Sequence, residues 1–372
     1  MTRIAPRWLT EPKTRAVMAA LAPARPMFVG GCVRDALMGR DSEDIDIAVA
    51  SPPADTQNLA ERAGLKAVPT GADHGVVTVI ADGAPFEVAT LRRDVATDGR
   101  RAVVAFTDQI GEDAARRDFT MNALYADSDG AVLDPLGEGL ADLKARRLRF
   151  IGDAEQRIRE DYLRILRFFR FHAQFGITPL DAEGLAACHA QNDGLRVISA
   201  ERIGAEMKKL LTAPDPGPAL KGMGPILTDI LPAAEWPNDL IVAEADWRLA
   251  PNPMRRLAAL GAKSLDRLRL SKSETTQIDK TLAAVQLPVC EAAYRFGMEI
   301  TVDAAVINGK AKAAHLDEIR NAASAVFPIT AAHLIERGMA PGPHLGAALK
   351  RLEAVWIKSG FEADQKELLN DL

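Results

Sequence analysis

The pattern of apolar residues changes once along this chain of 372 residues, near Leu140, and the change limits the folds it can adopt. Residues 27–135 combine short apolar stretches of strand length with a helical stretch, which is typical of a domain that contains both strands and helices. From about Leu140 onward, Leu, Ala, Arg and Glu recur at helical spacing and the Val, Thr and Gly content falls. The sequence therefore predicts an α+β fold, with a mixed β-sheet first and an all-helical part after it.

Several elements of the first part can be placed from the sequence. Residues 27–29 and 45–49 predict short strands, and residues 56–63 predict a helix between chain-breaking residues. Residues 75–80 and 86–91 predict a β-hairpin, because residues 81–84 between them contain an Asp-Gly step. We therefore expect the sheet to be at least partly antiparallel.

Composition excludes several classes of protein. The hydrophobic share of 48% allows more than one buried core, and the net charge of -5 excludes a globally basic nucleic-acid coat protein. The cysteines, Cys32, Cys188 and Cys290, lie far apart, which excludes a disulfide framework and a four-thiolate zinc site. No export signal and no apolar run of membrane-spanning length is found, so we expect a soluble, cytoplasmic protein.

The first candidate site contains two glycines, Gly30 and Gly31, between an apolar strand and a predicted helix. Glycine lets a ligand approach the backbone closely, and the N–H groups at a helix N-terminus attract phosphate. Arg34, in the same motif, is a further candidate nucleotide contact. The alternative interpretation is a tight turn that binds no ligand.

The second candidate site is a set of carboxylates. Asp44 and Asp46 alternate with Ile45 and Ile47, so we expect both carboxylates on one face of a strand. Two like charges on one face are stable where a divalent cation neutralises them, and hard oxygen ligands suit Mg²⁺ shared with substrate phosphates. Glu87, on a neighbouring predicted strand, is a third candidate ligand, and three such carboxylates can hold two Mg²⁺ ions about 4 Å apart. A solvated strand edge is the alternative.

The third candidate site is the segment from Arg116 to Asn122, which leads into a strand. The planar guanidinium groups of Arg116 and Arg117 can bind a triphosphate, and Asp118 or Asn122 can bind ribose hydroxyls. The alternative is a helix C-terminus at which the two arginines oppose the helix dipole.

The fourth candidate site is in residues 160–171, which predict one helix with Asp161 and Arg164 as neighbours on one face. Cytosine and adenine both present an amine donor beside a ring-nitrogen acceptor. Asp161 can accept from the amine while Arg164 donates to the ring nitrogen, and guanine or uracil would leave both groups unpaired. Arg167 is a further candidate nucleotide contact, and the alternative is a simple surface ion pair between Asp161 and Arg164.

Two basic stretches favour an RNA partner, because clustered Lys and Arg bind phosphates. For the second stretch, solvated helix faces are the alternative. The first stretch contains Lys144, Arg146, Arg147, Arg149, Arg157, Arg159, Arg164, Arg167 and Arg170. The second contains Arg248, Arg255, Arg256, Lys263, Arg267, Arg269 and Lys272.

In order and spacing, these motifs resemble those of the bacterial class II tRNA nucleotidyltransferases, the CCA-adding enzymes, which share their ancestry with bacterial poly(A) polymerases. The common elements within residues 28–171 are Gly-Gly-x-Val-Arg-Asp, Asp-x-Asp, a Glu-bearing strand, Arg-Arg-Asp-Phe-Thr and Glu-Asp-x-x-Arg. The resemblance continues through residues 198–203 and reappears in residues 328–346, with little to match between them.

This resemblance implies a nucleotidyltransferase-type head (residues 1–139), a helical neck that recognises the base (140–212), and a helical body and tail that bind tRNA (213–372). It implies that the three carboxylates hold Mg²⁺, that Asp118 and its neighbours contact the ribose, and that the Asp-x-x-Arg pair selects CTP and ATP. The partner would be the 3′ end of tRNA.

Residues 92–101 resemble the flexible loop of family members that add A. The resemblance leaves three activities open: full CCA addition, addition of A alone, and poly(A) synthesis. A catalytically silent RNA-binding module is a further alternative. The oligomeric state is not defined by the sequence.

Overall fold

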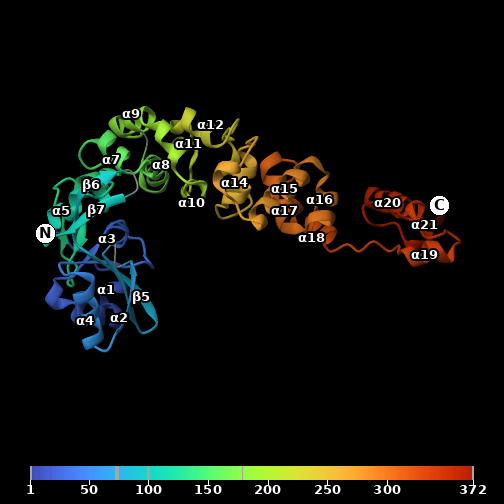
Figure 1. Cartoon of the computed structure of the whole chain (residues 1–372). Coiled ribbons are helices and arrows are strands. Elements are labelled where there is room, and N and C mark those ends of the chain that lie inside the picture. The colour runs from blue at the N-terminus through green and yellow to red at the C-terminus, as the bar shows by residue number, and fades with distance from the viewer. Residues whose placement is uncertain (1, 72–74, 99–100, 178, 371–372) are drawn as a thin grey trace. The chain divides into compact units, whose positions relative to one another are not determined.

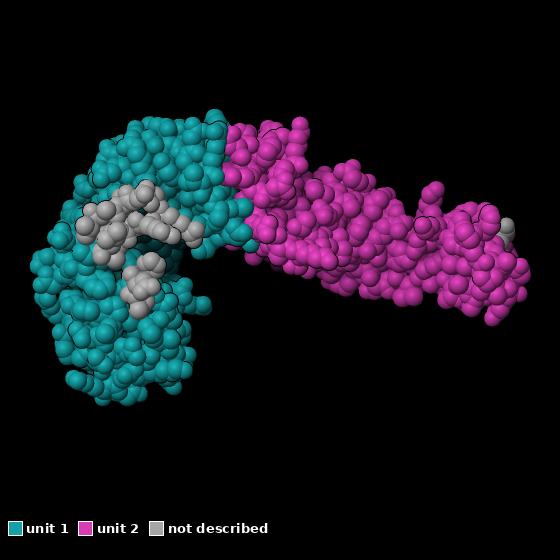
Figure 2. All heavy atoms as spheres, in the orientation of Figure 1, with its two compact units in different colours: residues 1–210, 218–226 teal, residues 211–217, 227–372 magenta. Residues whose placement is uncertain are grey.

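The computed structural model describes residues 2–71, 75–98, 101–177 and 179–370. It divides into two compact units (Figure 2), of which the first comprises residues 1–210 and 218–226 and the second residues 211–217 and 227–372. The boundary expected between head and neck falls inside the first unit and stays a prediction.

A seven-stranded mixed sheet is the core of the N-terminal part of the first unit (Figure 1), with the strand order β3-β4-β5-β2-β1-β8-β9. Strands β2 and β5 are parallel, and the other neighbouring pairs are antiparallel. The predicted α+β class and the partly antiparallel sheet are confirmed. The strands are β1 (Met27–Val29), β2 (Asp46–Val49), β3 (Lys66–Gly71), β4 (Val76–Ala81), β5 (Ala84–Thr90), β8 (Tyr125–Ala126) and β9 (Val132–Leu133).

The predicted hairpin is the β4–β5 pair, in which Ala81 lies opposite Ala84. Asp82 and Gly83 form its turn with positive φ angles of 48° and 75°. A two-residue turn with positive φ at both positions matches the right-handed twist of the strands, which is why an Asp-Gly step predicts it well.

The segment expected to be a flexible loop has a different structure. Residues 92–101 contribute to β6 (Arg92–Asp98) and to the start of β7 (Arg101–Phe106), which pair as an antiparallel ribbon. Residues 99 and 100 lie outside the described residues. The described part of this segment is therefore strand rather than loop, and its likeness to the flexible loop of relatives that add A stays a prediction.

Helices follow the sheet, and an aromatic cluster attaches helix α8 (Leu163–Phe175) to the segment that follows α5 (Ile110–Ala115). The Phe119 ring centroid lies 4.8 Å from that of Phe150 and 5.5 Å from that of Phe171. Because Phe119 directly follows Asp118, this packing fixes the third candidate motif against α8. The other helices up to residue 230 are α1 (Arg7–Thr10), α2 (Pro12–Ala20), α3 (Gly31–Leu37), α4 (Pro53–Arg62), α6 (Gly139–Ala145), α7 (Ala154–Glu160), α9 (Ala182–Ala190), α10 (Ala200–Leu211), α11 (Gly217–Met223) and α12 (Pro225–Ile230).

The described residues of the second unit contain helices and no strand. Near its end, Leu334, Leu352 and Trp356 belong to one buried apolar cluster. No helix in the described ranges has both the length and the apolar character needed to cross a bilayer. The helices are α13 (Leu240–Asp246), α14 (Pro253–Ala259), α15 (Lys272–Gln286), α16 (Val289–Phe296), α17 (Met298–Asn308), α18 (Leu316–Ala323), α19 (Ala331–Glu336), α20 (Pro343–Lys358) and α21 (Gln365–Asn370).

Candidate active site

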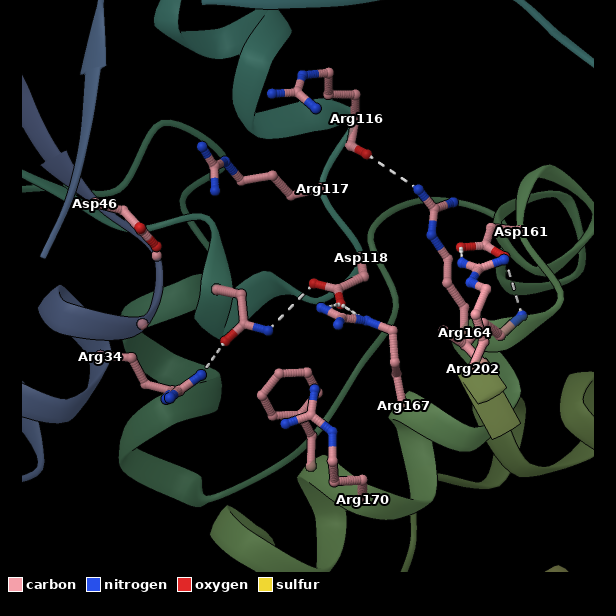
Figure 3. A pocket seen from close by; sticks show the side chains of 15 residues that line it. Arg34, Asp46, Arg116, Arg117, Asp118, Asp161, Arg164, Arg167, Arg170 and Arg202 are labelled. Carbon is pink, nitrogen blue, oxygen red and sulfur yellow. Dashed lines mark hydrogen bonds and ion pairs between the residues drawn. The ribbon is translucent and has the colours of Figure 1, made fainter. Parts of the chain in front are cut away.

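A cavity of about 500 Å³ lies in the first unit, and seven of its fifteen lining residues are arginines (Figure 3). It brings together motifs that are separated by more than a hundred residues in the sequence. Asp44 and Glu87 are predicted site residues that do not line it. The predicted residues that do are Gly30, Gly31, Arg34, Asp46, Arg116, Arg117, Asp118, Asn122, Asp161, Arg164 and Arg167.

Gly30 occupies the turn between β1 and α3, with a φ of 74° that favours glycine. A Cβ atom at this position would lie 3.4 Å from Nη1 of Arg117. A side chain at residue 30 would thus strain the backbone and press on a guanidinium group that lines the cavity.

Asp46 and Glu87 are neighbours across the parallel pair of β2 and β5, where their Cα atoms are register partners. Strand β2 begins at Asp46, so Asp44 precedes the strand and is exposed. The prediction that one strand carries both aspartates is therefore wrong, because the pairing of β2 with β5 begins only at Asp46, although Ile45 before it is buried.

The pKa of Asp46 is raised to about 6. Burial is the largest cause, and the negative charge of Glu87 adds to it, while Arg117 acts in the opposite direction. Within the described residues, no three His, Cys, Asp or Glu side chains are grouped so that they could hold a metal ion. The metal-binding roles of Asp44, Asp46 and Glu87 stay a prediction.

Asp113 on α5 orients two of the cavity arginines and is not among the predicted site residues. Its Oδ1 accepts from Arg116 Nη2 at 2.6 Å, and its Oδ2 accepts from Arg117 Nη2 at 2.9 Å and from the Tyr125 hydroxyl at 2.6 Å. Burial would raise the pKa of Asp113, but the charges of Arg117 and Arg116 outweigh it and lower the pKa to about 2. The spacing of three and four residues from Asp113 to the arginines is the signal that could have identified it.

A chain of hydrogen bonds links Arg34, Asn122, Asp118 and Arg167 (Figure 3). Asn122 Oδ1 accepts from Arg34 Nη1 at 2.6 Å, and Asn122 Nδ2 donates to Asp118 Oδ1 at 3.2 Å. Asp118 Oδ2 accepts from Arg167 Nε at 2.8 Å. Although burial opposes it, Arg167 holds the pKa of Asp118 below its usual value. Four predicted residues from three motifs are therefore in direct contact.

The fourth motif is not one helix. Helix α7 ends at Glu160, Asp161 has extended backbone angles (φ -155°, ψ 104°), and α8 begins at Leu163. The Asp161 Oδ1 accepts from the Leu163 backbone N–H at 3.2 Å. Aspartate favours helix starts because its side chain can satisfy a free N–H group there, and this capping preference breaks the predicted helix.

Asp161 and Arg164 each pair with a different side chain. Arg164 Nη1 donates to Glu160 Oε2 at 2.5 Å and to the Arg157 carbonyl at 2.7 Å. Asp161 Oδ2 accepts from Arg202 Nη2 at 2.7 Å. Arg202, on α10, is not a predicted site residue, and the tertiary contact that brings it here has no local sequence signal.

Comparisons with known proteins point to one family. Residues 27–149 match the poly(A) polymerase head domain family. The mitochondrial CCA tRNA nucleotidyltransferase 1 of Danio rerio is 33% identical over 377 residues, which cover 93% of this chain and 86% of the relative. The CCA-adding enzyme of Streptococcus pyogenes serotype M2 is 34% identical over 375 residues, which cover 91% of this chain and 90% of the relative.

The chain belongs to the CCA-adding tRNA nucleotidyltransferase family. The alignments cover nearly the full length of both relatives and of this chain, so this chain is a nucleotidyltransferase. The crystal structure of the Bacillus stearothermophilus CCA-adding enzyme in complex with CTP aligns with a TM-score of 0.75 and 26% identity, over 94% of each chain.

In this member of the CCA-adding family, the cavity wall includes Arg170 and Phe171 of α8, which are not among the predicted site residues. The Arg170 guanidinium lies 3.9 Å from the Phe171 ring centroid, and its Nε donates to Glu206 Oε2 at 2.6 Å. Cation–π contact and ion pair together hold Arg170 in one place.

The basic stretches have more acidic partners than the sequence suggests. In the first stretch, Arg147 pairs with Asp181 and Arg149 with Asp142. In the second, Arg255 and Arg256 are buried. For Arg255 and Arg256, the predicted RNA contact and the alternative of a solvated helix face are therefore both wrong.

Proposed function

We propose that this chain adds C and A nucleotides, as CCA, to the 3′ end of tRNA, using CTP and ATP and releasing pyrophosphate. The observation that carries the proposal is one cavity in which the glycine turn, Asp46, the Arg-Arg-Asp segment and the Asp-x-x-Arg segment meet. Family membership and the CTP complex of a relative point to the same substrates.

The triphosphate is proposed to lie against the arginines beside Gly30. Arg117 is anchored by Asp113, and Arg34 by Asp35 at 2.9 Å, so both guanidinium groups have fixed directions. Fixed planar donors bind phosphate oxygens without losing side-chain freedom at that moment. The positive φ of Gly30 keeps the adjacent backbone open to the same phosphates.

The ribose is proposed to bind at Asp118 and Asn122. Asp118 uses one oxygen for Arg167 and the other for the Phe119 N–H and Asn122. Arg167 donates to Asp118 Oδ2 through both Nε and Nη2, so all four lone-pair sites of this carboxylate are occupied. A ribose hydroxyl would replace the 3.2 Å bond from Asn122, which leaves Arg167 in place and frees the Asn122 amide for the ribose.

The divalent metal used by nucleotidyltransferases is proposed to be Mg²⁺ held by Asp44, Asp46 and Glu87. Asp46 and Glu87 suit this ion, because they are hard oxygen ligands on adjacent strands and the charge of Glu87 helps to raise the pKa of Asp46. In the described residues Asp44 is not grouped with both of them, so it would have to approach them when the ion binds. When bound, Mg²⁺ would neutralise phosphate charge and lower the pKa of the attacking hydroxyl.

The reaction itself is a nucleotidyl transfer. The 3′ oxygen of the RNA forms a bond to the α-phosphorus of the nucleotide and loses its proton, and the bond from that phosphorus to the pyrophosphate oxygen breaks. Such transfers depend on positioning and charge stabilisation rather than on a covalent intermediate. Asp161 and Arg164 would supply the base choice by accepting from the amine and donating to the ring nitrogen.

A direct test uses three tRNA substrates that lack one, two or three terminal nucleotides, each incubated with a single nucleoside triphosphate. CTP should extend the substrates that lack two or three nucleotides, and ATP should extend only the substrate that ends in CC. Incorporation of ATP without CTP would indicate an A-adding enzyme, and long A tails would indicate a poly(A) polymerase. Tight tRNA binding without incorporation would indicate a silent RNA-binding module.

We further propose a cytoplasmic location. Cys32, Cys188 and Cys290 are all free thiols, as is usual in reducing compartments.

A further inference from the structure

Asp161 is held at both carboxylate oxygens by groups from two different elements (Figure 3). Its Oδ1 accepts from the Leu163 N–H at the start of α8, and its Oδ2 accepts from Arg202 Nη2 of α10. Both side chains line the cavity, and 30% of Asp161 and 28% of Arg202 is exposed. A carboxylate fixed at two points cannot rotate, so its remaining lone pairs have fixed directions.

Arg202 matters because the backbone does not restrain Asp161 in a helix. Asp161 sits in the break between α7 and α8, with extended backbone angles. The Leu163 N–H bond of 3.2 Å is long, whereas the Arg202 bond of 2.7 Å joins two charged groups. Charge-assisted bonds are about twice as strong as neutral ones, so Arg202 is the stronger of these two anchors.

The anchored carboxylate has a defined chemistry. Each oxygen has two lone pairs, so Asp161 can accept an exocyclic amine without releasing Arg202. Because donors hold both oxygens, the lone pairs that remain present acceptors of fixed direction to the base. A base carbonyl in this position, as on uracil or guanine, would face lone pairs and stay unpaired, which is costly in a cavity.

Arg164 is held in a comparable way by a different partner. Its Nη1 donates to Glu160, and Glu160 also pairs with Arg157 at 2.9 Å. The acceptor and the donor of the base-reading pair thus have separate anchors, Arg202 and Glu160.

We infer that Arg202 is a positioning residue that determines base specificity through Asp161. It selects nucleoside triphosphates whose base carries an exocyclic amine beside an unprotonated ring nitrogen. This inference rests on the proposed function, because it presupposes incorporation of C and A.

The test compares the Arg202→Met variant with the matched control Arg196→Met. Arg196 also lies in the first unit and pairs with an aspartate, Asp193, but 80% of its side chain is exposed. The readout is the kcat/KM of CTP and ATP relative to UTP and GTP, on tRNA substrates that need C or A. Arg202→Met should lower this ratio about tenfold, the effect of one misplaced polar group, and Arg196→Met should leave it unchanged.

A conservative variant separates positioning from a structural role. Arg202→Lys keeps a cationic donor and should retain more selectivity than Arg202→Met, and it replaces the latter if thermal unfolding shows that Arg202→Met does not fold. A purely structural residue would change rates with all four nucleotides equally. Parent-like selectivity in both variants, at any overall rate, would overturn the inference.

A double-mutant cycle tests whether Arg202 acts through Asp161. In an Asp161→Asn background, Arg202→Met should cause no further loss of selectivity. An additional tenfold loss would show an independent route and refute the inference. A parent protein that incorporates neither C nor A would refute the proposed function itself, whereas a selective parent with an equally selective Arg202→Met variant would refute only the role of Arg202.

Discussion

Arginine–carboxylate pairs occur in two very different settings in this molecule. In the first unit, the pairs of Arg167 with Asp118 and of Arg202 with Asp161 border a cavity. In the second unit, Arg256 and Glu244 form a pair in which the two residues are only 1% and 3% exposed. The same kind of ion pair orients hydrogen-bond donors and acceptors beside a cavity in the first unit and is buried in the interior of the second unit.

The buried network in the second unit is formed by contacts within the protein. Glu244 accepts from both Arg255 and Arg256, and Arg256 also donates to the carbonyls of Leu211 and Ala213. Glu244, Arg255 and Arg256 do not line the cavity of the candidate active site. Position relative to a cavity, rather than residue type, therefore separates a candidate site residue from a structural one.

The variant with the largest expected effect is Asp46→Asn, which tests whether a residue that lines the cavity serves function rather than stability. If Asp46 serves substrate and metal, incorporation should fall about 10⁴-fold or more, because several kcal/mol of charge stabilisation are lost. The free energy of unfolding, in contrast, should rise in this variant. The pKa of Asp46 is raised to about 6 in the folded state, so the ionised carboxylate of the parent protein lowers its stability at pH 7.

The check is single-nucleotide incorporation together with urea unfolding at pH 7 without divalent ions. The tRNA affinity should stay within a few-fold, and the free energy of unfolding should rise or stay constant. Near-normal turnover with Mg²⁺ would show that Asp46 does not belong to the metal site, and Asp44→Asn offers a second test of that site.

Glu244→Ala tests the other side of the comparison. Removing this carboxylate leaves Arg255 and Arg256 buried without it, and breaking a buried pair costs about 3–5 kcal/mol. The free energy of unfolding from urea titration should fall by that amount, while the folded protein should retain its nucleotide selectivity. The control is Glu291→Ala, whose partner Arg295 is at the surface, and which should cost under about 1 kcal/mol. Equal losses in both variants would contradict the assignment.

Asp113→Asn lies between the two cases, because Asp113 is buried but orients cavity arginines. Its folded-state pKa of about 2 lies below the unfolded value near 4, so it stabilises the protein above pH 4 by about 2–3 kcal/mol. This contribution is lost as the pH falls from about 4 to 2.

Urea unfolding of the parent and of Asp113→Asn should therefore differ fully at pH 6 and less at pH 3.5. Incorporation should also fall, because Arg117 loses its anchor. Asp193→Asn, at an exposed ion pair, is the control and should change neither property. A deficit that does not depend on pH would contradict the charge-based explanation.

The sequence predicts those parts of the fold and site that depend on local patterns. The hairpin turn at Asp82-Gly83 follows from the φ angles that the two residues tolerate, and β1 follows from a short apolar run before the glycines. The break at Asp161 escapes prediction because helical spacing continues through it, while its side chain caps α8 instead. The helical spacing of the apolar residues is the same whether the aspartate lies inside one helix or caps the start of a second helix, so this spacing cannot distinguish the two cases.

Anchoring partners escape prediction for a different reason. Asp113 is one turn from the arginines it holds, so its role could have been inferred from local spacing. Arg202 reaches Asp161, 41 residues away, only through the tertiary contact between α10 and the α8 region, and Glu206 reaches Arg170 in the same way. The buried positions of Arg255 and Arg256 likewise depend on tertiary packing, since their charge alone predicts a surface.

The smallest expected effect concerns base choice, at the border between the two settings. Arg164 lines the cavity but is largely covered, and it pairs with Glu160 much as Arg256 pairs with Glu244. If it reads the base, Arg164→Ala should reduce the preference for CTP and ATP over UTP and GTP by about 1–3 kcal/mol, the cost of an unpaired polar partner. If Arg164 is only structural, the free energy of unfolding should fall and selectivity should not.

Incorporation rates with all four nucleotides at fixed salt separate these outcomes. Arg159→Ala, another arginine that pairs with a glutamate four residues away, is the matched control. Parent-like discrimination in both Arg164→Ala and Asp161→Ala would assign base reading to another part of the cavity and place Arg164 with the structural arginines.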